Sequence, residues 1–223
     1  MVYSVGRVSI FGTSPNHEVI GEKQGAWDKL EFLHPESVDL IARAKRNTLT
    51  GYGYPLVPDS TPKAMLWKSK TKLPADYAMG NNEVMLVSEK FRDLVEQFEP
   101  SAHQFLPVEM LHAKDEAPFA TFYWFICCQL IDSLDPEHTT ITWGPKPELY
   151  HESVEGMRRG SWRYDQSVTP KQVAVFSLKA IGSRHLWRDP YYTRNYVNCS
   201  DVFGEAMKAA KLSGFGLIHF DQV

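Results

Sequence analysis

Two short segments of the chain place a histidine beside carboxylate side chains, the combination that general acid–base catalysis uses. The first segment holds His112, Asp115 and Glu116, and the second holds His151 and Glu152. A general base must lie within hydrogen-bond reach of the proton that it removes, and sequence neighbours seldom face one another. We therefore favour solvated loops for both segments. A small hydrolase or transferase that uses one of these His/acid pairs is the alternative function.

The cysteines and the remaining histidines do not show the spacing of a nucleophile or a metal site. Cys127 and Cys128 lie in an apolar run, where burial raises the pKa of a thiol and makes it unreactive. The eight histidines form no i, i+4 pair and no Cys/His ligand pattern. The sequence contains no phosphate loop, nucleophile elbow, zinc helix or EF-hand loop. We expect no metal, no cofactor and no catalytic residues.

A third segment, residues 157–164, mixes arginines with aromatic residues. Single-stranded nucleic acid is bound by stacking and positive charge together. The chain, however, has 24 Lys and Arg against 27 Asp and Glu, so a nucleic acid or an anionic membrane is not favoured. Arg, Trp and Tyr also dominate protein–protein hot spots. We predict a partner-binding loop, and an ordinary exposed loop with its tryptophan in the core is the simpler interpretation. The predicted anchors are Arg158, Arg159, Trp162, Arg163 and Tyr164.

Two serines 112 residues apart, Ser88 in LVSEKF and Ser200 in NCSDVF, begin matching patterns. Each serine is a candidate helix N-cap, and the acid after it faces the positive end of the helix dipole. Each is followed by an apolar stripe at helical spacing and then by a strand. Duplication of a helix–strand unit and shared capping chemistry are both open explanations. The stripes are Phe91, Leu94, Val95 and Phe98, then Phe203, Ala206, Met207 and Ala210.

The other elements indicate an α+β fold. The run 118–131 is apolar on both alternating faces, which predicts a central strand buried on both sides. Residues 104–110 predict a strand at an edge or with a bulge, because Pro107 cannot donate to the ladder. Helices and strands alternate without a regular βαβ rhythm, which predicts a mixed or antiparallel sheet with a few short helices. Further strands are expected over 3–10, 84–87, 139–143, 172–178 and 215–220, and helices over 35–45, over 89–98 and from Ser200 to a close at Gly214.

The length of 223 residues suits a single domain over 1–223, with a subdivision near 112–117 as the alternative. The N-terminal residues lack the basic start and the apolar run of a signal peptide. No later run approaches the roughly 18 apolar residues of a membrane span. We expect a cytoplasmic protein, and the sequence does not indicate an oligomeric state.

Three blocks of the sequence together resemble a known family. They are LVSEKFRDLVEQFEPSAHQFLPVEM, then the apolar FYWFICCQLIDSLD, and finally HLWRD followed by NCSDVFGEAMKAAKLSGFGLIHF. In this order and spacing they resemble family number eleven of the bacterial polymorphic-toxin immunity proteins, the Imm-eleven type. The resemblance covers roughly residues 80 to 223. The matching positions are Ser88, Ser200, Leu134-Asp135 and Trp187-Arg188-Asp189.

The resemblance implies a cytoplasmic protein without catalysis of its own that binds and neutralises a cognate bacterial toxin, in contact-dependent competition or type VI secretion. It implies that the toxin's active site is occluded. The partner would be a protein, with a nuclease among the candidate toxins, and not nucleic acid or a membrane. If the toxin is basic, acidic clusters rival the 158–164 loop as the binding surface, because charge complementarity speeds association. These clusters are Asp115-Glu116 and Asp132, Asp135 and Glu137.

Overall fold

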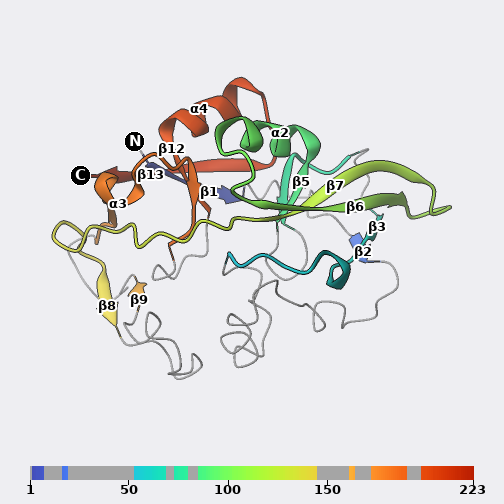
Figure 1. The fold of residues 1–223 in the computed structure, drawn as a ribbon. Helices are drawn as coiled ribbons and strands as arrows, with labels where there is room; N and C mark the ends of the chain where they lie inside the picture. The colour runs from blue at the N-terminus through green and yellow to red at the C-terminus, as the bar shows by residue number, and fades with distance from the viewer. Residues whose placement is uncertain are drawn as a thin grey trace.

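The computed structural model describes residues 2–7, 17–19, 53–68, 73–79, 85–144, 161–163, 172–189 and 197–223. In this part of the chain, two mixed β-sheets lie next to each other, and helices α2 and α4 pack together above them (Figure 1). The α+β class with a few short helices is confirmed. The helix predicted over 35–45 lies outside the described residues.

The first sheet has six strands in the order β2-β3-β6-β7-β5-β4. β3 is parallel to β6, and the other neighbouring pairs are antiparallel. The apolar run is the central strand β7 as predicted, although the strand ends at Ile126. The strands are β2 His17–Val19, β3 Ala64–Trp67, β4 Tyr77–Met79, β5 Met85–Ser88, β6 Gln104–His112 and β7 Pro118–Ile126.

Strand β6 lies inside this sheet, so of the two predicted alternatives, an edge strand or a bulged strand, the edge position is wrong, whereas β6 does have a register shift further along the strand. Pro107 pairs with Tyr123 of β7 on one side. On the other side the pairing with β3 begins only at Glu109, so no described strand needs an N–H from the proline. The register shift of β6 lies at Met110/Leu111, beyond the proline.

The second sheet has five strands in the order β10-β13-β1-β12-β11. β10 is parallel to β13, and the other pairs are antiparallel. The strands predicted over 139–143 and 172–178 are shorter than expected, as β8 and β10. The strands of the second sheet are β1 Val2–Arg7, β10 Val175–Phe176, β11 Leu186–Trp187, β12 Val197–Ser200 and β13 Phe215–Gln222. Strands β8 Thr142–Gly144 and β9 Ser161–Arg163 form a separate pair. Two short helices are η4 Pro58–Ser60 and α3 Leu178–Ile181.

Both predicted serine caps are present. Helix α2 (Glu89–Phe98) begins after Ser88, and helix α4 (Asp201–Ala209) begins after Ser200. Each serine hydroxyl accepts a hydrogen bond of 3.2 Å from the phenylalanine N–H three residues on. Helix α4 ends before Gly214, however, and Lys211 adopts the left-handed conformation there, with φ of 52°. Gly214 (φ +86°) instead allows a close approach, since a Cβ at this position would lie 2.3 Å from the Tyr77 carbonyl oxygen.

The two sheets repeat one folding unit. In the first unit, residues 17–126, α2 connects the parallel strands β5 and β6, and the antiparallel β7 lies between them. In the second unit, residues 133–223 with 2–7, α4 connects β12 and β13, and the antiparallel β1 lies between them. The outer strands also correspond, β4 with β11 and β3 with β10. In the sequence, the middle strand β7 comes after the other strands of the first unit, whereas the middle strand β1 comes before the other strands of the second unit. The two units are therefore related by a circular permutation.

The strand register is the same in the two units. In each unit, the cap serine pairs with one residue of the middle strand. The residue 17 positions after that serine pairs with the middle-strand residue three positions further along. The alignment of Ser88 with Ser200 therefore holds in space, as a duplicated unit requires. The pairs are Ser88 with Phe122 and Phe105 with Phe125 in the first unit, and Ser200 with Val2 and Leu217 with Val5 in the second.

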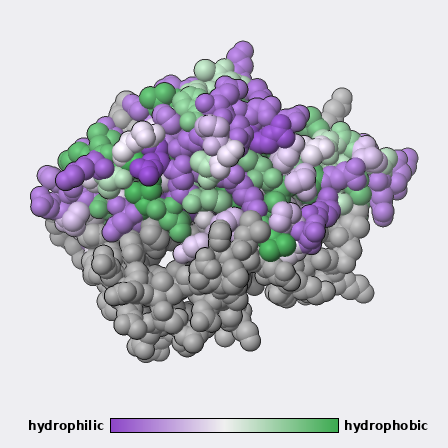
Figure 2. Space-filling view, viewed as in Figure 1, coloured by the Kyte–Doolittle hydropathy of each residue, from purple (hydrophilic) through white to green (hydrophobic). Residues whose placement is uncertain are grey.

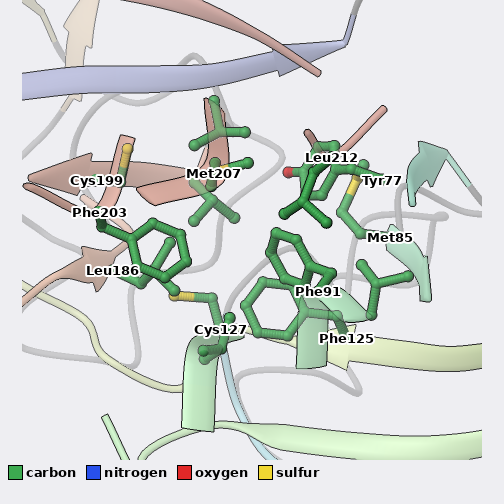
Figure 3. Packing of buried hydrophobic residues seen from close by; sticks show 14 residues of the cluster. Tyr77, Met85, Phe91, Phe125, Cys127, Leu186, Cys199, Phe203, Met207 and Leu212 are labelled. Carbon is green, nitrogen blue, oxygen red and sulfur yellow. The ribbon is translucent and has the colours of Figure 1, made fainter. Parts of the chain in front are cut away.

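A shared apolar core holds the two units together (Figure 3). Phe203 of α4 meets Phe91 and Phe98 of α2 edge-on, with ring centroids 6.4 and 5.2 Å apart. Two further cores cover the opposite faces of the sheets. In one of them, Trp124 Nε1 donates to the Pro62 carbonyl at 2.9 Å and ties the 53–63 segment to the first sheet. No helix in the described ranges is long and apolar enough to span a membrane.

Candidate functional site

The predicted partner-binding anchors lie mostly outside the described residues. This is so for Arg158, Arg159 and Tyr164. Trp162 and Arg163 belong to β9, where they pair with β8 and Trp162 lies opposite Trp143. The partner-binding role of this loop therefore stays a prediction.

The His/acid pairs are not brought together where the structure describes them. His112 is the last residue of β6, and Asp115 lies in the turn that follows; both are exposed. The His112 ring stacks on Phe119 with 4.4 Å between centroids, and Asp115 accepts a hydrogen bond from the Ala117 N–H at 3.2 Å. Neither contact joins the imidazole to the carboxylate. The second pair, His151 and Glu152, lies outside the described residues.

The three cysteines are free thiols in apolar surroundings. Cys127 and Cys199 are buried, and Cys128 is partly buried. Burial raises the pKa of both Cys128 and Cys199 to about 12. At neutral pH these two thiols are protonated, and a protonated thiol is not a nucleophile.

The second acidic cluster forms a turn at the start of the second unit. Asp135 accepts hydrogen bonds from the backbone N–H groups of Glu137 and His138, both at 3.0 Å. The imidazole of His138 lies 2.8 Å from the same carboxylate and holds the pKa of Asp135 below its ordinary value. Asp132 and Glu137 are exposed beside it. The carboxylate of Asp135 thus stabilises the turn.

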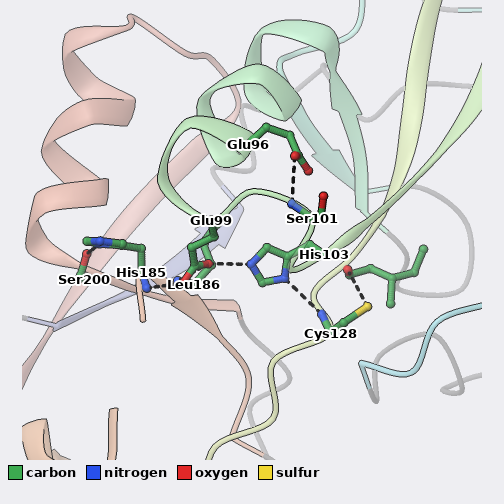
Figure 4. A network of polar contacts seen from close by, with 9 residues as sticks. Glu96, Glu99, Ser101, His103, Cys128, His185, Leu186 and Ser200 are labelled. Atoms are coloured by element: carbon green, nitrogen blue, oxygen red, sulfur yellow. Dashed lines mark hydrogen bonds and ion pairs between the residues drawn. The ribbon is translucent and has the colours of Figure 1, made fainter. Parts of the chain in front are cut away.

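A buried carboxylate that sequence reasoning missed joins the two units (Figure 4). Glu99, directly after α2, accepts hydrogen bonds from the N–H groups of His185 (2.6 Å) and Leu186 (3.2 Å) at β11. Its Oε2 also lies 2.7 Å from Nε2 of His103. The Cys128 N–H donates to Nδ1 of that ring at 3.2 Å, a contact that fits the tautomer with its proton on Nε2, the nitrogen that faces Glu99. The Glu99–His103 spacing of four was the available sequence signal.

The surroundings of Glu99 keep it ionised. Burial is the largest influence and alone would raise its pKa, but the hydrogen bonds from His103 and from the His185 N–H outweigh it. The pKa of Glu99 is therefore lowered from its ordinary value of 4.5. A buried carboxylate is stable in this form only with such donors around it.

The second unit makes an equivalent contact with the first unit. Ser213, after α4, donates to Oδ2 of Asp76 through its N–H (2.8 Å) and its hydroxyl (2.7 Å). Its carbonyl accepts from the Tyr77 N–H of β4 at 3.1 Å. In each unit, therefore, the turn after the helix is hydrogen-bonded to the short outer strand of the other unit. Interactions of this kind fix how the units sit on each other.

One part of this network has the distances of a nucleophile and its base. The Ser200 hydroxyl lies 2.8 Å from Nδ1 of His185. In a catalytic triad, an acid would bind the other ring nitrogen of the histidine. Here Glu99 binds the His185 backbone N–H, and the Ser200 hydroxyl caps α4 through Phe203. We assign the pair a structural role. Among the residues with described positions, no group of three or more His, Cys, Asp or Glu could hold a metal ion.

The chain matches a sequence model of a family described as Immunity protein family (Imm11), over residues 14–222. The match extends well into the N-terminal 80 residues that the three sequence blocks leave out. No curated protein matches the chain.

Proposed function

The chain belongs to the Imm11 immunity protein family, and we propose on that premise that it binds and neutralises one cognate bacterial toxin. The observation that carries the proposal is the family match over 14–222. The arrangement of the candidate residues is consistent with a binding protein. The thiols with raised pKa are protonated, and Glu99 and Ser200 are occupied by contacts that hold the scaffold together.

Neutralisation would be steric: the protein covers the active site of the toxin and has no catalysis of its own. A specific complex of this kind buries about 1,600 Å² in total, and a few aromatic and arginine anchors dominate its energy. The toxin is a protein of the producing cell's own competition system, with a nuclease among the candidates. The complex forms in the cytoplasm, where the toxin would otherwise act.

Co-expression tests this proposal. The neighbouring toxin gene is induced in a host with and without this chain, and growth and affinity pull-down are measured. We expect growth to be restored and the two proteins to be recovered together. A non-cognate immunity protein of the same family is the matched control and should restore nothing. If the chain neither rescues growth nor retains the toxin, the proposed function is wrong.

A further inference from the structure

One face of the first sheet is only partly covered by its helix. Helix α2 packs against β5 and β7. Along β6, Leu106 and Val108 point into the core on one face, whereas Pro107 and Glu109 are exposed on the other. Thr121 of β7 is exposed on the same side as Glu109, its strand partner. We call this exposed side of β6 and β7, next to α2, the open face.

An aromatic ring and an arginine border the open face. Tyr123, half-buried on β7, lies opposite Pro107. The guanidinium of Arg92 stands 4.6 Å above the Tyr123 ring and donates to its hydroxyl. Glu89 (3.0 Å) and Asp93 (2.7 Å) hold the other side of the guanidinium. Tyr and Arg are the commonest interface anchors, and a side chain held before binding loses less entropy in the complex.

The hairpin of β6 and β7 ends in an arm, residues 112–118. Strand β3 pairs with β6 as far as His112, so the turn of the arm extends beyond the paired part of the sheet. Figure 1 shows it projecting from the sheet, and its end is hydrophilic in Figure 2.

The arm has a built turn and an exposed surface. His112 N–H donates to the Ala117 carbonyl at 2.9 Å, and Glu116 N–H donates to the His112 carbonyl at 2.8 Å. Stacking of His112 on Phe119 covers one side of the turn. Residues 112–118 are all exposed. The arm presents a preformed surface to a partner.

The charge of this region identifies the chemistry of the partner. The exposed charges of the open face and the arm are three carboxylates and one lysine, a formal charge of −2; they are Glu109, Asp115, Glu116 and Lys114. The other nearby carboxylates belong to α2 or follow it, where Glu89 and Asp93 pair with Arg92 and Glu99 is buried. A surface with this charge attracts a basic partner.

We propose that the open face and the arm together form the docking surface for a basic protein. The inference rests on the proposed function, under which the occupant is the cognate toxin, bound through its cationic surface. Tyr123 and Arg92 would supply the anchoring contacts. The carboxylates of Glu109, Asp115 and Glu116 would steer the encounter, because complementary charge mainly raises the association rate.

The test is the association rate of the full chain with the purified product of the neighbouring toxin gene, measured at low and high salt. The arm variant combines Glu109→Gln, Asp115→Asn and Glu116→Gln. Asparagine keeps the acceptor for the Ala117 N–H, so the turn is preserved. At low salt, the association rate should fall by about tenfold, with a weaker salt dependence. Lys114→Glu, which adds negative charge to the arm, should raise the rate.

The control variant changes the charge by the same amount elsewhere, with Glu205→Gln and Asp221→Lys, both exposed. In 0.1 M salt the control should stay within about twofold of the unmodified protein, because charges further than roughly 10 Å from the docking surface are screened there. At lower salt its effect should remain smaller than that of the arm variant. Equal effects of both variants, or no effect of the arm variant, would overturn the assigned surface and leave the proposed function intact. A toxin that fails to bind the unmodified chain overturns the proposed function and this inference with it. Self-association that the arm variant abolishes would assign the surface to a second copy instead.

Discussion

Replacing Glu99 by glutamine should destabilise the fold far more than an isosteric change usually does. Two backbone N–H groups and one imidazole N–H of neighbouring elements converge on its carboxylate, which is 7% exposed. Oε1 accepts from His185, and Oε2 accepts from His103 and Leu186. Glutamine keeps one oxygen, and its NH2 group must face a donor at the other position. In either orientation, at least one buried N–H loses its acceptor.

The size of the effect follows from this count. A buried donor left without an acceptor costs about 1–3 kcal/mol. The remaining hydrogen bonds also weaken, because those to a charged acceptor contribute about 1.5–3 kcal/mol against about 1 for neutral ones. We expect Glu99→Gln to lower the free energy of unfolding by about 2–4 kcal/mol. For a protein of this size, each kcal/mol corresponds to about 2–4 °C in Tm.

The assay is urea unfolding of the two proteins between pH 7 and pH 3.5. The pKa of Glu99 is lowered in the folded state, so its contribution is fully present above the ordinary value of 4.5 and is lost as the pH falls through the folded pKa. The difference between the unmodified protein and Glu99→Gln should therefore be constant near neutral pH and shrink below about pH 4.5.

Glu96 provides the matched control on the same helix. It accepts a hydrogen bond of 3.0 Å from the Ser101 N–H at the surface, and Glu96→Gln should cost less than about 0.5 kcal/mol. If Glu99→Gln costs no more than this control, or if its effect does not change with pH, Glu99 does not join the two units as we describe.

The remaining predictions concern the local geometry of the two units, and urea unfolding measures both. Ser88→Ala and Ser200→Ala should each cost about 1 kcal/mol, since each removes an N-cap; a negligible loss at both sites would contradict the capping assignment. Gly214→Ala should lower the free energy of unfolding by more than about 2 kcal/mol, because the new Cβ would lie 2.3 Å from the Tyr77 carbonyl oxygen. Gly182 also has a positive φ, but a Cβ there meets only a flexible side chain at 3.4 Å, so Gly182→Ala should cost about 1 kcal/mol. Equal costs at the two glycines would rule out the close approach as the cause.

The sequence predicts those features of the fold that are set within a few residues. The caps at Ser88 and Ser200 and the helices after them follow from neighbouring side chains, and the structure confirms them. The central position of the run 118–126 follows from its apolar faces. For β6 the sequence left an edge or a bulge open, and the edge alternative is wrong, because the effect of Pro107 depends on where β3 begins to pair, which local sequence does not state.

Contacts between distant segments could not be predicted in this way. Strand β1 completes the second unit by pairing with β12, and the buried hydrogen bond between Ser4 and Asn198 spans 194 residues. Glu99 meets His185 across 86 residues. Both pairings depend on the order of strands in the sheets, and one sequence alone contains no signal for that order. For the site, sequence identified the exposed His112–Glu116 turn but not the open face beside it.

The two units differ informatively at one equivalent helix position. In the first, Arg92 lies above Tyr123 and leaves the ring half-buried. In the second, Gly204 lies so close to the corresponding Tyr3 that a Cβ would be 3.0 Å from the ring. The second unit therefore packs its tyrosine directly on the helix, a contact that an arginine would exclude. Since both units satisfy the same strand register, the scaffold does not require the arginine. Tyr3 is half-buried as well, and the ammonium group of Lys208 stands 5.4 Å from its ring centroid, so both units place a cation over this ring and differ in which helix residue supplies it.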